Sequence, residues 1–103
     1  MELTENKVRD IFDCADKQRE IEKYLQELLY DNAIEKKCYC NWLIEYPNYN
    51  KENGFEFKIE ITSEDKQYKV KEVFYVGYEW EKEKKLIEEI VIKLIIHLKD
   101  KTI

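Results

Sequence analysis

The sequence predicts a single α+β domain with the element order α-β-β-β-α, in which a three-stranded antiparallel meander carries helices packed on one face. Three observations lead to this prediction: a long helical pattern over residues 1–34, three strand-like segments within residues 36–80, and an amphipathic helix over residues 81–99. A chain of 103 residues has the size of one domain. With 44% hydrophobic and 40% charged residues, two Gly and one Pro, the composition is typical of an ordered protein.

The closing helix, residues 81–99, is predicted to lie across the sheet and to supply the largest share of the core. Its apolar side chains recur with helical spacing over one half of the circumference. These are Leu86, Ile87, Ile90, Val91, Leu94, Ile95 and Leu98. Ile92 and Ile96, spaced i,i+4, fall on the polar side instead. In one interpretation the first helix covers them, or they are simply exposed to solvent. In the other they contact a partner or a second copy of the chain in a homodimer.

Residues 1–34 are predicted to form a long N-terminal helix. Thr4 is a suitable N-cap, and Leu3 and Val8 have the spacing of a hydrophobic staple. No Gly or Pro interrupts the pattern as far as Asn32. The apolar positions rotate around the helix along its length, which indicates a bend or two different environments. We expect the second half to pack on the domain and the first half to project from it.

Acidic residues form a stripe along this first helix, away from its apolar positions. The stripe consists of Asp13, Asp16, Glu20, Glu27 and Asp31. Residues 1–34 hold nine acids and five bases, a net charge of −4, whereas the whole chain has a net charge of −5. One interpretation is an ordinary solvated helix face. The other is a row of carboxylates that imitates nucleic-acid phosphates for a protein partner with a basic surface.

Three strands are predicted between the helices, because apolar side chains alternate there with polar ones. The apolar sides of the first two strands are Cys38, Cys40, Trp42, Ile44 and Tyr46, and then Phe55, Phe57, Ile59 and Ile61. Pro47 ends the first strand. The third begins with Tyr68 and Val70, and its alternation changes phase at Lys71 and Glu72. A β-bulge is predicted at these two residues.

The sequence holds no recognisable catalytic or metal-binding constellation, and we predict neither enzyme activity nor a cofactor. His97, the one histidine, falls on the edge of the buried face of the closing helix and is interpreted as a packed or boundary residue. Cys38 and Cys40 point the same way in a strand and are interpreted as small core side chains. Together with Cys14 these residues are an allowed zinc ligand set, but the spacing of a zinc knuckle is absent.

Cellular location follows from composition. No segment approaches the roughly 18 apolar residues of a membrane span. The first residues lack the pattern of a signal peptide. Three Cys is an odd count, and without a secretory signal it favours reduced thiols. We therefore expect a cytoplasmic protein without a membrane partner.

The element order resembles that of the double-stranded RNA-binding domain. In that family a basic helix N-terminus after the third strand contacts phosphates. Lys82, Lys84 and Lys85 stand at about this place in the chain. The resemblance implies nucleic-acid binding through these lysines as an alternative function. Glu81 and Glu83 offset them, and the chain has no basic excess, so nucleic acid is not the expected partner.

The small size, the acidic stripe and the lack of a catalytic constellation resemble phage-encoded inhibitors of bacterial defence, anti-CRISPR proteins among them. The resemblance implies a non-enzymatic inhibitor in the bacterial cytosol that blocks a nucleic-acid-binding defence protein, such as a CRISPR nuclease. Tyr30, Tyr39 and Tyr49 are the aromatic residues expected to anchor the contact. A further alternative is a homo-oligomeric structural protein joined through Ile92 and Ile96 or through the projecting helix.

Overall fold

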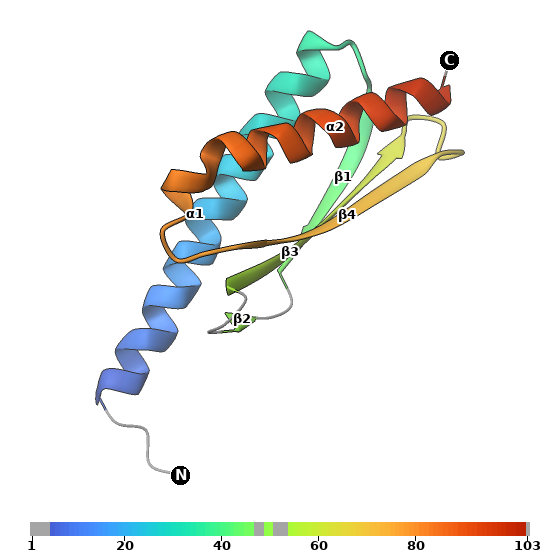
Figure 1. Cartoon of the computed structure of the whole chain (residues 1–103). Helices are drawn as coiled ribbons and strands as arrows, with labels where there is room; N and C mark the ends of the chain where they lie inside the picture. Colours follow the sequence, from blue (N-terminus) through green and yellow to red (C-terminus); the bar gives the residue numbers. More distant parts are fainter. Residues whose placement is uncertain (1–4, 47–48, 51–53, 103) are drawn as a thin grey trace.

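Helix is the first and the last element of the structure, and the strands between the helices form one antiparallel sheet (Figure 1). The computed structural model describes the backbone of residues 5–46, 49–50 and 54–102 and the side chains of residues 15–46 and 54–102. Its elements are helix α1 (Glu5–Glu35), strands β1 (Cys40–Glu45), β2 (Tyr49–Asn50), β3 (Gly54–Ser63) and β4 (Lys69–Val76), the 3₁₀ helix η1 (Trp80–Glu83) and helix α2 (Lys84–Thr102). The predicted α+β fold is confirmed, and β2 is an addition of two residues to the predicted strands.

β3 is the central strand of the sheet, and each strand that pairs with it is antiparallel to it. β1 pairs with residues 58–63 of β3, and β4 pairs with residues 55–62. Because β1 and β4 share partners in β3, they lie on its opposite edges. β2 pairs with Gly54 and Phe55 at the start of β3. The sheet is therefore the predicted meander, with β1 and β4 at its edges.

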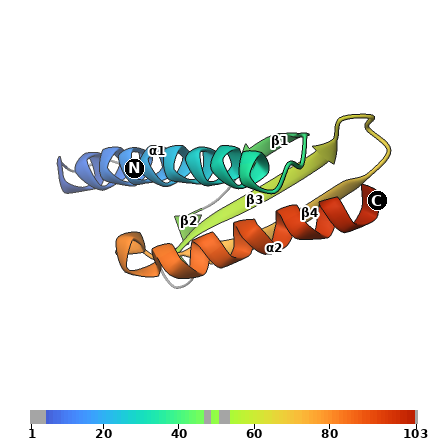
Figure 2. The ribbon, with the colours of Figure 1, turned by 90° about the horizontal axis from the view of Figure 1, so that it is seen from above.

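The core lies between one face of the sheet and the two helices (Figure 2). β3 alternates between fully buried side chains and side chains that are partly exposed. Its inward side chains include Phe55, Phe57, Ile59 and Ile61. The helices contribute Ile21, Leu25 and Leu29 from α1 and Ile87, Val91, Leu94, Ile95 and Leu98 from α2. The helices thus cover one face of the sheet, because alternation with period two brings every second side chain to the same face.

α1 is 31 residues long, which corresponds to about 45 Å of helix. Its N-terminal part extends beyond the sheet, along the longest dimension of the molecule, 55 Å (Figure 1). In the second half Ile21, Leu25 and Leu29 are fully buried. This half therefore packs on the domain, as the rotation of the apolar positions predicted.

α1 ends in a Schellman motif in which a lysine takes the position usual for glycine. Lys37 has a left-handed backbone conformation with φ of 54°. The backbone N–H groups of Lys37 and Cys38 donate to carbonyls of the last helical turn at 3.1 and 2.9 Å. From α2, the ammonium group of Lys99 donates to the Lys36 carbonyl at 2.7 Å. The end of α1 is thereby joined to α2, and the chain turns directly into β1.

The predicted β-bulge at Lys71 and Glu72 is wrong. The register between β3 and β4 runs without interruption from Phe55 opposite Val76 to Thr62 opposite Lys69. Glu72 lies opposite Ile59 and so belongs to the inward face of the sheet, yet it is exposed. The physical reason is that β4 is an edge strand, where a long side chain on the inward face can still reach water.

α2 departs from the prediction at both ends and at one apolar position. The predicted helix over residues 81–99 begins as η1 and continues as α2 to Thr102. Leu86, predicted to face the core, is exposed instead. It lies in the first turn of α2 on the flank of the buried stripe, and the rest of the domain covers only the centre of that stripe.

Candidate protein-binding surface

The first half of the acidic stripe is neutralised by its own helix. The carboxylate of Asp16 lies 3.8 Å from the guanidinium group of Arg19, and that of Glu20 lies 3.7 Å from the ammonium group of Lys17. Residues 15–23 contain three acids and three bases. Asp13 lies in α1, but its side chain is outside the part of the chain whose side chains are described. This segment therefore offers a partner little net negative charge.

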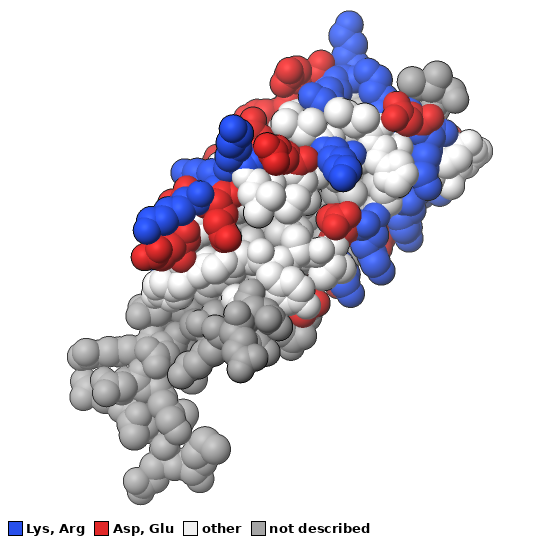
Figure 3. Space-filling model, viewed as in Figure 1, with Lys and Arg blue, Asp and Glu red and all other residues white. Residues whose placement is uncertain are grey.

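The second half of the stripe is uncompensated. Residues 24–35 of α1 contain Glu27, Asp31 and Glu35 and no Lys or Arg. All three are exposed, and among the described side chains no ion pair within 4.0 Å involves them. On the face shown in Figure 3 acids and bases are mixed, and basic residues gather toward the end of the molecule where the chain ends in Figure 1. Of the stripe residues with described side chains, the two acids without an ion pair, Glu27 and Asp31, thus lie in the last three turns of α1.

Two neighbouring hollows lie between this segment of α1 and the strand β1. The first, about 380 Å³ in volume, lies against Tyr30, Ile34 and Trp42. The second, about 340 Å³, shares Tyr30 and Trp42 and reaches Glu27 and Asp31. We call the two together the α1–β1 groove. Its full lining is Gln26, Glu27, Tyr30, Asp31, Ala33, Ile34, Cys38, Tyr39, Cys40, Asn41, Trp42 and Glu64.

Large apolar side chains are exposed along the α1–β1 groove. Tyr30 and Ile34 are each 60% exposed, and Tyr39 is 77% exposed. Tyr49, also predicted to anchor a partner, pairs through its backbone with Phe55, but its side chain lies outside the described residues. Single exposed apolar residues are ordinary on protein surfaces, whereas several around one hollow are typical of an interaction site.

Sequence reasoning identified part of this groove and missed the rest. Tyr30, Tyr39, Glu27 and Asp31 were predicted as contacts, and the structure places all four in its lining. Trp42 was assigned to the core from strand alternation, and it is only half-buried because it lies at the groove. Ile34 and Glu64 carry no signal of their own, because their role depends on which elements meet there.

Contacts with other elements fix α1 in place over the sheet. The nearby carboxylate of Glu22 raises the pKa of the Tyr46 hydroxyl, just after β1. Lys17 lies 3.6 Å from Glu81 of η1. One of these contacts joins α1 to the residue after β1, and the other joins it to η1, which precedes α2. The groove is therefore a preformed feature rather than a space between loosely attached elements.

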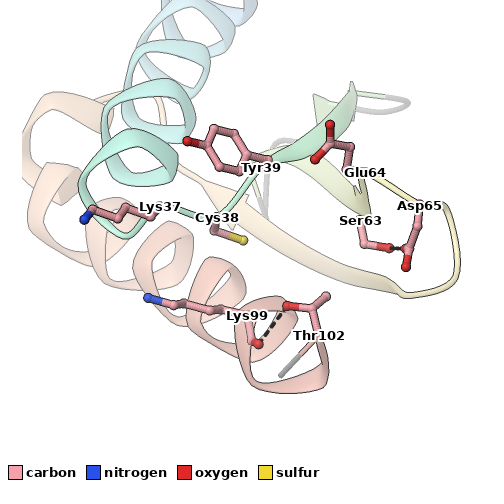
Figure 4. Close-up of a pocket in the computed structure, with 8 residues that line it drawn as sticks. All are labelled: Lys37, Cys38, Tyr39, Ser63, Glu64, Asp65, Lys99 and Thr102. Atoms are coloured by element: carbon pink, nitrogen blue, oxygen red, sulfur yellow. Dashed lines mark hydrogen bonds between the residues drawn. The ribbon is translucent and has the colours of Figure 1, made fainter.

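A third hollow, about 470 Å³ in volume, lies at the opposite side of the Cys38–Tyr39 segment (Figure 4). Several of its polar groups already have hydrogen-bond partners. The Ser63 hydroxyl donates to the Asp65 carboxylate at 2.6 Å, and this bond, followed by one from the Gln67 backbone N–H, lowers the pKa of Asp65. We interpret this hollow as a structural feature that accommodates the β3–β4 turn beside the end of α2.

Both described thiols are held in their protonated form. Burial raises the pKa of Cys40 to about 11, and the neighbouring Cys38 adds to the effect. Burial also raises the pKa of Cys38. The sulfur of Cys38 lies 4.0 Å from the carbonyl oxygen of Ile95 in the core. Cys38 is thus a small core side chain, as predicted, whereas Cys40 is half-buried and packs against the core at the groove.

We expect both thiols to react slowly with an aromatic disulfide reagent while the protein is folded. Thiolate is the reactive form, and folding raises the pKa of Cys40 from 9.0 to about 11. In a Cys14→Ser variant, the rate at about pH 8 should be at least about tenfold lower in buffer than in denaturant. Equal rates in both conditions would contradict the assignment.

The same shift has a consequence for stability. A thiol whose pKa is raised by folding keeps its proton when the unfolded chain loses it. The contribution of Cys40 to the free energy of unfolding should therefore be fully present below pH 9.0 and should be lost as the pH rises toward about 11. Urea midpoints measured across this range check the direction, and Cys40→Ser should reduce the pH dependence.

The three lysines of the alternative nucleic-acid site differ in what they contact. Lys82 binds Glu79 at 2.9 Å. The ammonium group of Lys84 lies over the rings of Tyr24 and Trp80, at 5.1 and 5.2 Å from their centroids. Lys85 is exposed. Two of the three lysines therefore already contact neighbouring side chains instead of forming an open basic row.

The remaining predicted positions lie on α2. Ile92 is half-buried, and Ile96 is 42% exposed, so the apolar strip on this side of the helix is smaller than expected. His97 is exposed rather than packed at the edge of the core. Within the described part of the chain, no three His, Cys, Asp or Glu residues are grouped as a metal site would require.

Comparison of the chain with protein-family models, curated protein sequences and solved structures finds no match. Among the described residues, neither helix has the length and apolar content needed to cross a membrane. The α1–β1 groove, with its exposed apolar side chains and its uncompensated acids, is the feature from which a function can be inferred.

Proposed function

We propose that this chain is a non-enzymatic protein-binding inhibitor that attaches to a basic, nucleic-acid-binding surface of its partner. The observation that carries this proposal is the pairing of Glu27 and Asp31, exposed and free of ion pairs among the described side chains, with the exposed Tyr30 between them in sequence. Carboxylates steer a basic partner, and an aromatic anchor supplies contact energy. The resemblance to phage anti-defence inhibitors suggests a bacterial defence nuclease, of the CRISPR type, as the partner.

A protein partner fits this surface better than nucleic acid does. Phosphates require a basic excess that releases counterions, and the last three turns of α1 contain acids alone among their charged residues. Lys82 and Lys84 already contact Glu79 and aromatic rings. This surface carries negative charge, as nucleic acid does, and would compete with nucleic acid for a basic surface on the partner.

Reversing the charges of Glu27 and Asp31 tests this proposal. The Glu27→Lys/Asp31→Lys variant should lose at least about tenfold in affinity for the partner, because two attractive contacts become repulsive. Asp16→Lys/Glu20→Lys makes the same change in net charge at positions whose carboxylates already pair with Arg19 and Lys17. It should lose much less affinity.

The measurement is capture from a bacterial lysate by immobilised wild-type protein and by each variant. The captured partner should bind nucleic acid, be released as salt concentration rises, and be displaced by added duplex DNA. Retention by the Glu27→Lys/Asp31→Lys variant equal to that of wild type, or failure of DNA to compete, would show that the mechanism is wrong.

A further inference from the structure

β1 leaves one of its two backbone edges open to a partner. The strand spans six residues and pairs with β3 along one edge. Among the described residues, no strand pairs with the other edge. An open edge presents alternating N–H and C=O groups, which are a template for an added strand. The α1–β1 groove contains Cys40, Asn41 and Trp42 of this strand, so the open hollow and the edge strand belong to one surface.

The flank of α1 provides an apolar wall beside this edge. Tyr30 and Ile34 are one helical turn apart and are both 60% exposed. They line the groove together with Trp42 of β1. A strand added beside β1 would continue the sheet at a spacing of about 4.8 Å and direct every second side chain toward the helix layer. Those side chains would cover Tyr30 and Ile34.

The charge of the groove selects the kind of strand that fits. Its lining includes Glu27, Asp31 and Glu64 and no Lys or Arg. Glu27 and Asp31 lie at one part of the groove, and Glu64 lies at the part beside Tyr39. An occupant with Lys or Arg residues flanking an apolar centre therefore matches the groove in both charge and polarity.

The opposite edge of the sheet has a different character. β4 carries Lys69, Lys71 and Glu72, which are all exposed. Charged residues, lysine above all, protect an edge strand from pairing with another chain. β1 has Leu43 exposed and no lysine. The two edges thus differ in the way expected if β1 alone accepts a strand.

We propose that the partner docks an extended, basic segment on the α1–β1 groove as an additional antiparallel or parallel strand on β1. Apolar side chains of the segment contact Tyr30, Ile34 and Trp42, and its Lys or Arg side chains meet Glu27 and Asp31. Main-chain hydrogen bonds supply affinity, and alternate side chains supply specificity. The basic character of this segment rests on the proposed function, whereas the strand addition rests on the open edge.

A peptide titration followed by NMR tests strand addition directly. The probe is a peptide of about nine residues built from Val, Thr and Arg, long enough to pass the length of β1. It should shift the backbone amide signals of residues 40–45 and slow their hydrogen exchange, while the signals of β4 stay in place. A peptide with Glu for Arg should bind at least about tenfold more weakly.

The backbone and the groove have separate controls. The same basic peptide with alternate nitrogens methylated cannot pair with β1, and it should lose binding. Ile34→Lys should abolish peptide binding, because it removes an apolar contact and repels the basic peptide, whereas Ile96→Lys, the same change at an exposed isoleucine of α2, should not. Equal binding of the methylated peptide, or equal effects of the two variants, would overturn the proposal. A dimer of the protein itself in light scattering that the peptide does not dissociate would also overturn it.

The two proposals can fail separately. If lysate capture depends on Glu27 and Asp31 but the peptide leaves residues 40–45 unchanged, strand addition is wrong and the proposed function stands. If the peptide adds to β1 but duplex DNA does not compete with the captured partner, the groove binds strands and the proposed function is wrong.

Discussion

Replacing Phe57 with Ala is expected to destabilise the folded protein by about 3–5 kcal/mol. Phe57 is fully buried at the centre of β3. Its ring lies 5.9 Å, centroid to centroid, from both Phe74 of β4 and Tyr46 at the end of β1. Truncation removes these contacts and leaves a cavity in the core on the inward face of the sheet. Because a domain of this size is stable by roughly 5–15 kcal/mol, the variant should be close to unfolding.

Chemical denaturation followed by circular dichroism measures this effect as a lower midpoint. Val73→Ala on the outward face of β4 is the matched control, because its side chain is already 41% exposed, and it should cost well under half as much. Phe57→Leu keeps most of the volume and provides a measurable variant if Phe57→Ala does not fold. A loss for Val73→Ala as large as that for Phe57→Ala would contradict the position of the core.

Replacing Gly54 with Ala is expected to cost more than about 2 kcal/mol, from backbone strain and steric overlap together. Gly54 has φ of 90°, a conformation that residues with a Cβ atom rarely adopt. An added Cβ would lie 2.4 Å from the carbonyl oxygen of Val76. The Cβ would be fixed to the backbone of β3 and the carbonyl belongs to the backbone of the paired strand β4, so neither can move without disturbing the sheet at the start of β3.

Gly77 provides a control of opposite sign. Its φ is outside the left-handed region, and an added Cβ would make an ordinary contact of 3.8 Å with the Glu83 carboxylate. Gly77→Ala should therefore leave stability unchanged or raise it by about 0.4–1 kcal/mol, because it reduces the freedom of the unfolded chain. Thermal melts of both variants check the pair. Destabilisation of the same size at both positions would be inconsistent with this geometry.

The preformed groove has a consequence for binding. An added strand gains affinity from a surface that does not need to be ordered first. The Schellman motif that ends α1, the hydrogen bond from Lys99 and the contact between Glu22 and Tyr46 all position the α1 flank beside β1. Residues outside the groove thus determine its shape, and variants at Lys99 or Tyr46 should be avoided as neutral controls in binding experiments.

The acidic stripe illustrates the limit of reading function from spacing. Helical periodicity places Asp16, Glu20, Glu27 and Asp31 on one face, and their exposure agrees with that. The pattern does not show that the first two are paired with bases and the last two are not. Ion pairing depends on side-chain rotamers and on neighbouring elements, so a uniform stripe in sequence becomes an uneven potential on the surface.

By itself the sequence determined the kind and order of the elements and most of the core, because strand alternation and helical spacing are local properties of the chain. It failed where burial depends on neighbours. Glu72 follows the regular register because β4 is an edge strand, and Leu86 is exposed because nothing covers the flank of α2. Only the tertiary structure decided that Tyr30 and Ile34 lie beside the open edge of β1, since the packing of α1 on the domain brings residues far apart in sequence to the same hollow as Trp42.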